Sequence, residues 1–154
     1  MYDLNMSILD NKQISFDFEI LEEYESGIEL QGTEVKSLRL KRGSLKGSRI
    51  VIRGNEAFLV GAEIPAYQQG NTRSDYEKDR TRKLLLTDKE IKELGGKLSQ
   101  KGLTAIPVSV YNKGRFFKLK FAVVRAKKKH DKRAKVKERE TNRVIERTLK
   151  RQYD

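Results

Sequence analysis

The sequence predicts a mainly β protein: a small antiparallel barrel of the oligonucleotide-binding type, with about three flanking helices and a basic C-terminal tail. Three observations lead to this prediction: short runs of alternating apolar and polar residues, turn residues between these runs, and an abrupt change of composition after residue 125. Closure into a barrel suits short antiparallel strands because it removes the sheet edges that otherwise invite aggregation. The pattern alone does not fix the order of the strands.

The first half of the chain is predicted to hold a strand, a short helix and a hairpin. Alternating apolar residues from Phe16 to Ile20 predict a half-buried strand that ends in a turn at Ser26-Gly27. A short helix is expected over 34–40, where apolar residues stand three apart. Apolar pairs on both sides of Gly54-Asn55 predict a hairpin over 49–64.

The second half begins with a long polar passage, 65–82, whose length and lack of periodicity indicate a functional or disordered loop. The three leucines at 84–86 predict a short buried strand, and the capping-box pattern at 87–90 predicts the start of a helix. This helix is expected to place Ile91, Leu94 and Leu98 on one face and to end at Gly102, although the glycine pair 95–96 in its middle costs roughly 1 kcal/mol per glycine relative to alanine. A second hairpin is expected to turn at 112–114.

The composition changes after this hairpin, so the chain divides into a body, 1–125, and a basic tail, 126–154. From Lys127 onward, twelve Lys and Arg residues stand against five acids, with few apolar residues. Such a segment buries too little apolar surface to offset the entropy lost on ordering. Ile145 and Leu149 stand four apart, so we expect the tail to be disordered when free and helical on a polyanion.

Charge indicates the class of partner. The chain carries 34 Lys and Arg residues against 22 Asp and Glu, a net charge of +12, and such a field attracts polyanions. Anionic lipid would need an amphipathic face with bulky apolar residues, whereas aromatics make up only 8% and tryptophan is absent. The chain shows no signal-peptide pattern and no apolar stretch near the roughly 18 residues of a membrane span. We therefore expect a cytoplasmic protein without a membrane partner.

The residues that would support catalysis are scarce. The chain has no cysteine and a single histidine, His130, which rules out a disulfide framework, a thiolate metal site and the usual triads. Glu22, Glu23 and Glu25 cluster, but alternation along a strand would place Glu22 on the opposite face, so a solvated surface is the preferred interpretation. We expect no enzyme activity, no cofactor and no metal site. A metal-dependent nuclease is the one enzyme class left open.

The polar passage instead carries the mixture that binds irregular RNA. Tyr67 and Tyr76 are rings on which exposed bases could stack, Asn71 offers hydrogen bonds, and the passage ends in the cations of 80–83. Each residue alone is more often an ordinary surface residue. Their concentration in one loop favours RNA.

Several motifs follow one another in a recognisable order along nearly the whole chain: Asn11-Lys12, 32–39 (GTEVKSLR), 64–71 (IPAYQQGN), 80–86 (RTRKLLL), 101–104 (KGLT), Lys127-Lys128 and 131–133 (DKR). In this order and spacing they resemble one family, the small protein B or SsrA-binding proteins, which partner transfer-messenger RNA in bacterial ribosome rescue. The resemblance implies an oligonucleotide-binding-like barrel with flanking helices, in agreement with the pattern. It further implies a body that grips the tRNA-like part of transfer-messenger RNA and a tail that enters the empty mRNA channel of a stalled ribosome.

The resemblance also implies which residues act. The RNA-binding set comprises Asn11, Lys12, Gly32, Glu34, Lys36, Tyr67, Asn71, Arg80, Arg82 and Lys83. The set expected to contact the decoding centre and small-subunit rRNA comprises Lys127, Lys128, His130, Asp131, Lys132 and Arg133. Glu34 has a second interpretation, as a first-turn acid favoured by the helix dipole. We expect the free protein to be a monomer. A ribosomal or assembly protein that binds rRNA alone remains the competing function.

Overall fold

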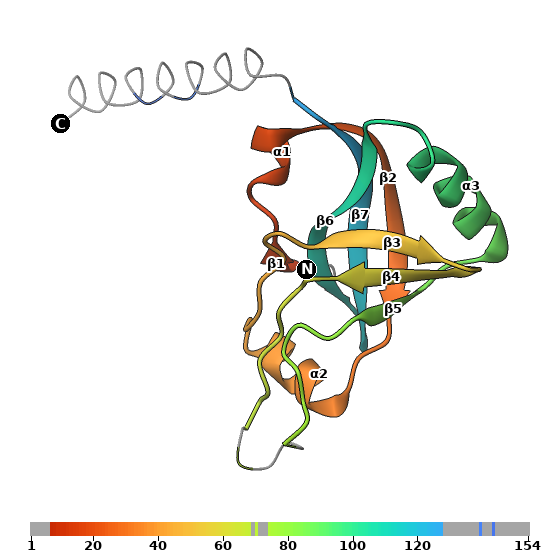
Figure 1. The fold of residues 1–154 in the computed structure, drawn as a ribbon. Coiled ribbons are helices and arrows are strands. Elements are labelled where there is room, and N and C mark those ends of the chain that lie inside the picture. Colours follow the sequence, from red (N-terminus) through yellow and green to blue (C-terminus); the bar gives the residue numbers. More distant parts are fainter. Residues whose placement is uncertain (1–6, 69, 71–73, 128–138, 140–142, 144–154) are drawn as a thin grey trace.

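The computed structural model describes residues 7–68, 70, 74–127, 139 and 143, and within them a seven-stranded antiparallel sheet with three helices (Figure 1). The elements are β1 (Ser7–Asp10), α1 (Ile14–Asp17), β2 (Phe18–Ile28), α2 (Gly32–Arg39), β3 (Arg49–Arg53), β4 (Glu56–Val60), β5 (Arg82–Leu85), α3 (Asp88–Leu98), β6 (Leu103–Lys113) and β7 (Phe116–Ala126). No helix of this described part is long and apolar enough to cross a membrane.

The sheet closes on itself. Its strands follow the order β1-β6-β3-β4-β5-β2-β7, and β7 also pairs with β6, so the strands from β6 to β7 form a ring while β1 extends one edge of β6. The β3–β6 contact that completes the ring is a single residue pair, Ile50 with Ala105. The result is a closed ring rather than a regular barrel. The prediction of a mainly β, barrel-like body with about three helices is confirmed.

The core lies inside this ring and depends on alternation along β7. Phe117, Leu119, Phe121 and Val123 all point inward and are buried. The Phe121 ring stacks on the ring of Tyr24 in the paired strand β2, with centroids 5.3 Å apart. Aromatic pairs at this separation add about 0.5–1.5 kcal/mol beyond the area that they bury.

A smaller apolar cluster lies on the opposite face of β7. Ile14 from α1 packs there with Ile106, Ala122 and Val124. The short helix α1 therefore covers the outside of the ring where β6 and β7 meet. Consequently β7 is buried on both faces from Phe121 to Val124, which explains its unbroken apolar run.

Helix α3 begins at the predicted capping box. The Thr87 N–H donates to Glu90 Oε1 at 3.1 Å, and the Glu90 N–H donates to Thr87 Oγ1 at 3.2 Å. Ile91 and Leu94 are the buried residues of this helix. The Gly95-Gly96 pair does not interrupt the helix, which ends at Leu98, a few residues before the predicted end at Gly102. Tertiary packing of the apolar face outweighs the low helix propensity of two glycines.

The strand predicted from Phe16 also needs correction. Residue 16 lies in α1, β2 starts at Phe18, and Ser26-Gly27 is not a turn but part of β2. The pairing of β2 with β7 from Phe18 to Gly27 holds this stretch extended. The chain pattern did not show this pairing because its partner lies about ninety residues away. The register shifts at Leu21, which breaks the expected alternation.

Two other local predictions need correction, and one strand was not predicted. The leucine strand is not fully buried, since Leu84 is buried but Leu85 is 52% exposed. The second hairpin turns at Gly114-Arg115, so the turn overlaps the predicted one at Gly114 and is shifted by one to two residues toward the C-terminus. The strand β1 was not predicted at all. The hairpin of β3 and β4 turns at Gly54-Asn55 as predicted.

The start of the basic tail is hydrogen-bonded to α1. The strand β7 ends at Ala126, and the Lys127 N–H donates to Asp17 O at 3.0 Å. The Lys127 ammonium donates to Ser15 O at 2.7 Å. Farther along, the Arg139 guanidinium lies 5.3 Å from the centre of the Phe16 ring. The remaining residues of 128–154, apart from Arg143, lie outside the described residues, so the predicted disorder and helix formation of the tail stay predictions.

Two glycines should respond to alanine with opposite signs. A Cβ at Gly96 would meet no atom within 4 Å, so Gly96→Ala is expected to raise the free energy of unfolding by about 0.5–1 kcal/mol. A Cβ at Gly43 would lie 2.9 Å from Glu63 O and 3.0 Å from Leu9 Cδ1, at φ +145°, so Gly43→Ala should destabilise the protein. Urea denaturation monitored by circular dichroism measures both. A destabilised Gly96→Ala would contradict the open helix surface.

Candidate nucleic-acid interface

Helix α2 places an acid in a buried position near its N-terminus. Gln31 precedes the helix in an extended conformation, and its N–H donates to Glu34 Oε1 at 2.7 Å. An acid in the first turn is favoured by the free N–H groups and the helix dipole. The Glu34 side chain is nevertheless 0% exposed. A buried carboxylate requires partners of opposite charge, and they come from the far end of the polar loop.

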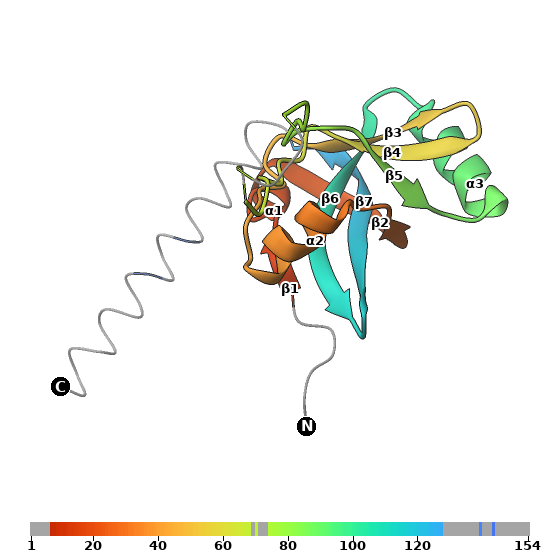
Figure 2. The same ribbon diagram turned by 90° about the horizontal axis from the view of Figure 1, so that it is seen from below.

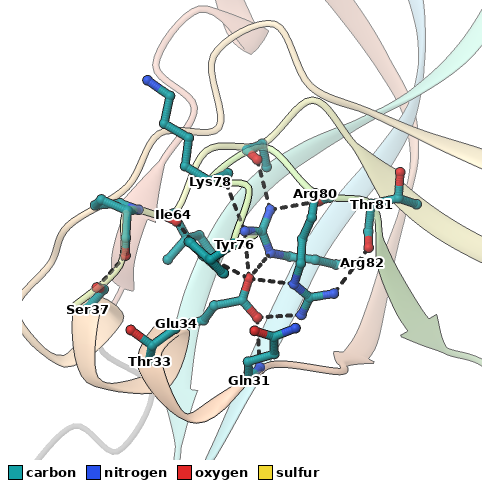
Figure 3. A network of polar contacts seen from close by, with 12 residues as sticks. Gln31, Thr33, Glu34, Ser37, Ile64, Tyr76, Lys78, Arg80, Thr81 and Arg82 are labelled. Carbon is teal, nitrogen blue, oxygen red and sulfur yellow. Dashed lines mark hydrogen bonds and ion pairs between the residues drawn. The ribbon is translucent and has the colours of Figure 1, made fainter. Parts of the chain in front are cut away.

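Two arginines supply these partners (Figure 3). The Arg80 guanidinium binds the Glu34 carboxylate through two N–H donors: Nε donates to Oε2 at 2.9 Å, and Nη2 donates to Oε1. Arg82 approaches the same carboxylate, with Nε 2.8 Å and Nη2 2.7 Å from Oε2. Paired donors of this kind form strong, geometrically specific contacts. One carboxylate therefore joins α2 to Arg80, just before β5, and to Arg82, the first residue of β5.

The Arg82 side chain, also 0% exposed, holds the backbone around it. Its Nη1 donates to Ala62 O at 2.8 Å and to Arg80 O at 3.0 Å, and its Nη2 donates to Lys78 O at 2.9 Å. These carbonyls come from both ends of the polar loop. A buried guanidinium thus fixes where the loop leaves the sheet and where it returns.

Tyr76 adds a third link within the loop. Its hydroxyl donates to Ile64 O at 2.5 Å and lies 3.2 Å from Glu34 Oε2. Burial and the negative charge of Glu34 raise the pKa of Tyr76 above its usual value, so the phenol stays protonated and keeps donating. Its role is therefore structural, whereas the sequence suggested an aromatic group for stacking on bases.

Electrostatics favour the charged form of Glu34. Burial alone would raise the pKa of this carboxyl, but the hydrogen bonds from Arg80 and the Gln31 N–H, together with the charge of Arg82, outweigh burial. The pKa of Glu34 is consequently lowered. Two cations against one anion leave the cluster with one positive charge beneath the surface.

The helix also holds the first residues of the loop. The Ser37 hydroxyl donates to Pro65 O at 2.6 Å, and the Tyr67 N–H donates to Thr33 Oγ1 at 2.8 Å. On the exposed side of α2, the Lys36 ammonium lies 5.7 Å from the centre of the Tyr67 ring. A cation and an aromatic ring are therefore held side by side next to solvent, a combination suited to a phosphate and a base.

Comparison with known proteins gives the family. Residues 8–151 match the family model described as SmpB protein. The chain belongs to the SmpB family. It is 45% identical over 144 residues to the SsrA-binding protein of Gloeothece citriformis, covering 94% of this chain and 93% of that protein. It is 46% identical over 145 residues to the SsrA-binding protein of Thermosipho africanus, covering 94% and 97%.

A solved structure agrees in fold. It carries the description "tmRNA-SmpB: a journey to the center of the bacterial ribosome" and shares 37% sequence identity with this chain. The match has a TM-score of 0.66 and covers 82% of this chain and 87% of the solved chain. The ring of strands described above is thus a fold of the SmpB family.

The residues expected from the SmpB resemblance fall into two layers, one of buried and one of exposed side chains. Glu34 and Arg82 are buried side chains, so a molecule on the surface cannot reach them while the cluster is intact. Lys36 is exposed and Tyr67 half-buried, on the outside of the same helix and loop. Arg80 belongs to both layers, because its side chain is 25% exposed while it grips Glu34.

The other expected RNA-binding residues lie around this group or outside the described residues. Gly32 is exposed at the first position of α2, and Asn71 lies outside the described residues. Lys83 follows the arginines on β5 and pairs with Glu56 at 3.2 Å. Asn11 Nδ2 donates to Pro107 O at 2.9 Å, which gives Asn11 a structural contact beside its expected role.

Lys12, the remaining member of the RNA set, is exposed next to Asn11. Among the residues expected at the decoding centre, Lys127 contacts α1, whereas Lys128, His130, Asp131, Lys132 and Arg133 lie outside the described residues. RNA or ribosome contact by these residues stays a prediction. In the described ranges no group of three or more His, Asp or Glu residues could hold a metal ion.

Sequence reasoning missed the residues that hold the cluster together. Gln31, Thr33 and Ser37 contribute through hydrogen bonds to the loop or to Glu34. The signal for Gln31 was present, because an acid three residues later is the spacing of a capping box. No local signal connects Thr33 to Tyr67, which stands 34 residues away.

Replacing Glu34 tests the central role of its charge. Glu34→Gln leaves the buried guanidinium of Arg82 and the partly exposed one of Arg80 facing a neutral amide, so the free energy of unfolding at pH 7 should fall by about 3 kcal/mol. The lowered pKa means that this stabilisation is present in full above the ordinary value of 4.5 and is lost as the pH falls through the lower folded-state pKa. Urea denaturation from pH 7 to pH 3 should show the variant and wild type converging in acid.

Glu56→Gln is the matched control, because Glu56 pairs with Lys83 on the surface with about half of its side chain exposed. An exposed pair contributes about 0–1 kcal/mol. A Glu34→Gln variant no less stable than Glu56→Gln would contradict the charge cluster as the main link between α2 and the loop.

Proposed function

We propose that this chain binds transfer-messenger RNA through its body and helps to deliver this RNA to stalled ribosomes. The observation that carries the proposal is the near full-length similarity to proteins named SsrA-binding protein, at 45% and 46% identity. The solved structure described as tmRNA-SmpB in the bacterial ribosome supports the same partners. The role is one of binding, without catalysis, in the cytoplasm where ribosomes work.

The structure suggests how the body would do this. The buried cluster of Glu34, Arg80 and Arg82 fixes the polar loop against α2. Lys36 and Tyr67 are thereby presented together without a further cost of ordering them on binding. Glu34 and Arg82 are positioning residues in this account, and Lys36, Tyr67, Lys12 and the exposed part of Arg80 contact the RNA.

The tail would report whether the mRNA channel is vacant. A basic segment that folds only against rRNA competes with mRNA for the same space, so an occupied channel rejects it by steric exclusion and not only by charge. The residues assigned to this step are Lys127, Lys128 and 130–133. Because Lys127 is attached to α1, the tail would leave the body at a fixed point.

Binding to rRNA alone was the competing function. The names of the relatives specify SsrA, and the solved structure pairs the family with tmRNA, so neither favours an rRNA-only role. Affinity purification from cells followed by RNA sequencing distinguishes the two. Enrichment of one small tRNA-like RNA supports our proposal, and rRNA as the sole enriched species contradicts it.

Lys36→Ala should weaken binding of the tRNA-like part of transfer-messenger RNA by roughly 1 kcal/mol, about fivefold, with a salt dependence shallower by about one unit of slope. The reason is the loss of one phosphate contact. Fluorescence anisotropy at several KCl concentrations measures both quantities. Lys92→Ala is the control, because Lys92 is an exposed residue of α3, and this variant should keep the wild-type slope. Equal slopes for the two variants would exclude a phosphate contact at Lys36.

Removal of the tail should separate the two proposed roles. A chain of residues 1–127 keeps the contacts of Lys127 with α1 and should bind the RNA within about threefold of wild type, because the RNA-binding residues remain. It should fail to support tagging of proteins on stalled ribosomes in a reconstituted translation system. Loss of tight RNA binding on truncation, or normal tagging without the tail, would contradict this division.

A further inference from the structure

The segment that follows α2 ends the helix in an unusual way. The Lys41 N–H donates to Leu38 O at 2.8 Å and the Arg42 N–H donates to Ser37 O at 3.0 Å, the two bonds of a Schellman motif. The residue after the C-cap in this motif adopts a left-handed conformation, which glycine usually supplies. Here that residue is Lys41, with φ +58°. Among the described residues it is the only one other than glycine with a positive φ.

A lysine at such a position is energetically unfavourable, because its Cβ crowds the backbone in the left-handed region. Strained residues of this kind occur preferentially where the side chain has a function. Lys41 is exposed, so packing gives no reason for a long side chain there. The remaining structural reason is a cation near a helix C-terminus, which is favourable with or without RNA.

Lys41 belongs to a group of cations without acidic partners. Several lysines elsewhere pair with glutamates, among them Lys97 with Glu22 and Lys120 with Glu23. Within the part of the chain that the structure describes, no carboxylate lies within 4.0 Å of the cationic group of five residues near the end of α2. These are Lys12, Arg39, Lys41, Arg42 and Lys46.

The backbone that carries these cations is fixed. Ser44 and Glu63 exchange two backbone hydrogen bonds of 2.8 and 2.9 Å, and Leu45 is buried. The tight approach of Gly43 to Leu9 brings the segment against β1 (Figure 2). The segment from Arg39, the last residue of α2, to Lys46 is termed the cationic loop below, and it is therefore held in place before any ligand arrives.

A cavity of about 250 Å³ separates the cationic loop from the segment after β1. Lys46 from the cationic loop and Lys12 from the segment after β1 both line this cavity, together with Asn11 and Asp10. Asp10 is the acid of this cavity, and its Oδ1 accepts a hydrogen bond from the Ser7 hydroxyl at 2.6 Å. A water molecule occupies about 30 Å³ in the liquid, so the cavity can admit a phosphate group with several waters.

We propose that the cationic loop and Lys12 form a phosphate-binding site for the RNA backbone, in which Lys46 and Lys12 flank one phosphate and Lys41 contacts a neighbouring one. Lys36 and Arg39 stand three apart on α2, so the site continues the exposed cationic side of the helix that bears Lys36. The inference rests on the proposed function and extends the RNA surface from the N-terminal to the C-terminal end of α2.

The test uses one substitution whose effects on stability and binding differ in sign. Lys41→Gly relieves the backbone strain, so the melting temperature should rise by about 2–4 °C. The same variant should bind the labelled tRNA-like part of transfer-messenger RNA about fivefold more weakly, with a salt slope shallower by about 0.7–0.9. Lys46→Ala should show the same loss of affinity and slope. Lys92→Ala on α3 is the control for net charge.

Each result bears on the proposal. A more stable Lys41→Gly with weaker, less salt-dependent binding supports it. If wild type binds this RNA tightly and Lys41→Gly binds it as well as Lys92→Ala does, the proposed phosphate site is overturned. The favourable interaction of the lysine with the helix dipole then remains as the reason for a lysine at position 41. A wild-type protein that does not bind this RNA overturns the proposed function and, with it, this inference.

Discussion

The body of this protein depends on one buried carboxylate. Glu34 is the only acid in a cluster with two guanidinium groups, and the backbone bonds of Arg82 extend its influence to both ends of the long loop. Without the acid, Arg82 would be buried without a counter-charge, at a cost of several kcal/mol, and Arg80 would lose its anionic partner. The position of the loop relative to α2, and of the exposed Lys36 beside the half-buried Tyr67, follows from this balance of charges.

The sequence predicted those features that are encoded locally. The capping box at Thr87, the hairpin turn at Gly54-Asn55 and the helix around Leu38 each depend on residues only a few positions apart. The start of β2 and the continuity of its Ser26-Gly27 segment depend on pairing with β7, about 90 to 110 residues away. A chain pattern contains no information about such a partner, so the sequence predicted a closed barrel but not the order of its strands, which comes from the structure.

The candidate site divides in the same way. Residue type and order identified the positions, including Glu34, Arg80 and Lys36, but not which of them are buried. An acid beside two arginines fits an exposed RNA face and a buried ion cluster equally well, and burial decides between these interpretations. The burial of Glu34 and Arg82 favours an indirect role for both residues. Their charge network positions the other residues that lie at the surface.

The place of β7 in the ring has a consequence for synthesis of the chain. This strand pairs with both β2 and β6, yet it is the last strand of the body to be translated. Until residue 126 has emerged, β2 and β6 each have a free edge, and the inward side chains of β7 are missing from the core. A nascent chain interrupted earlier would therefore expose strand edges and apolar surface, which makes it a substrate for chaperones and proteases rather than a partly working protein.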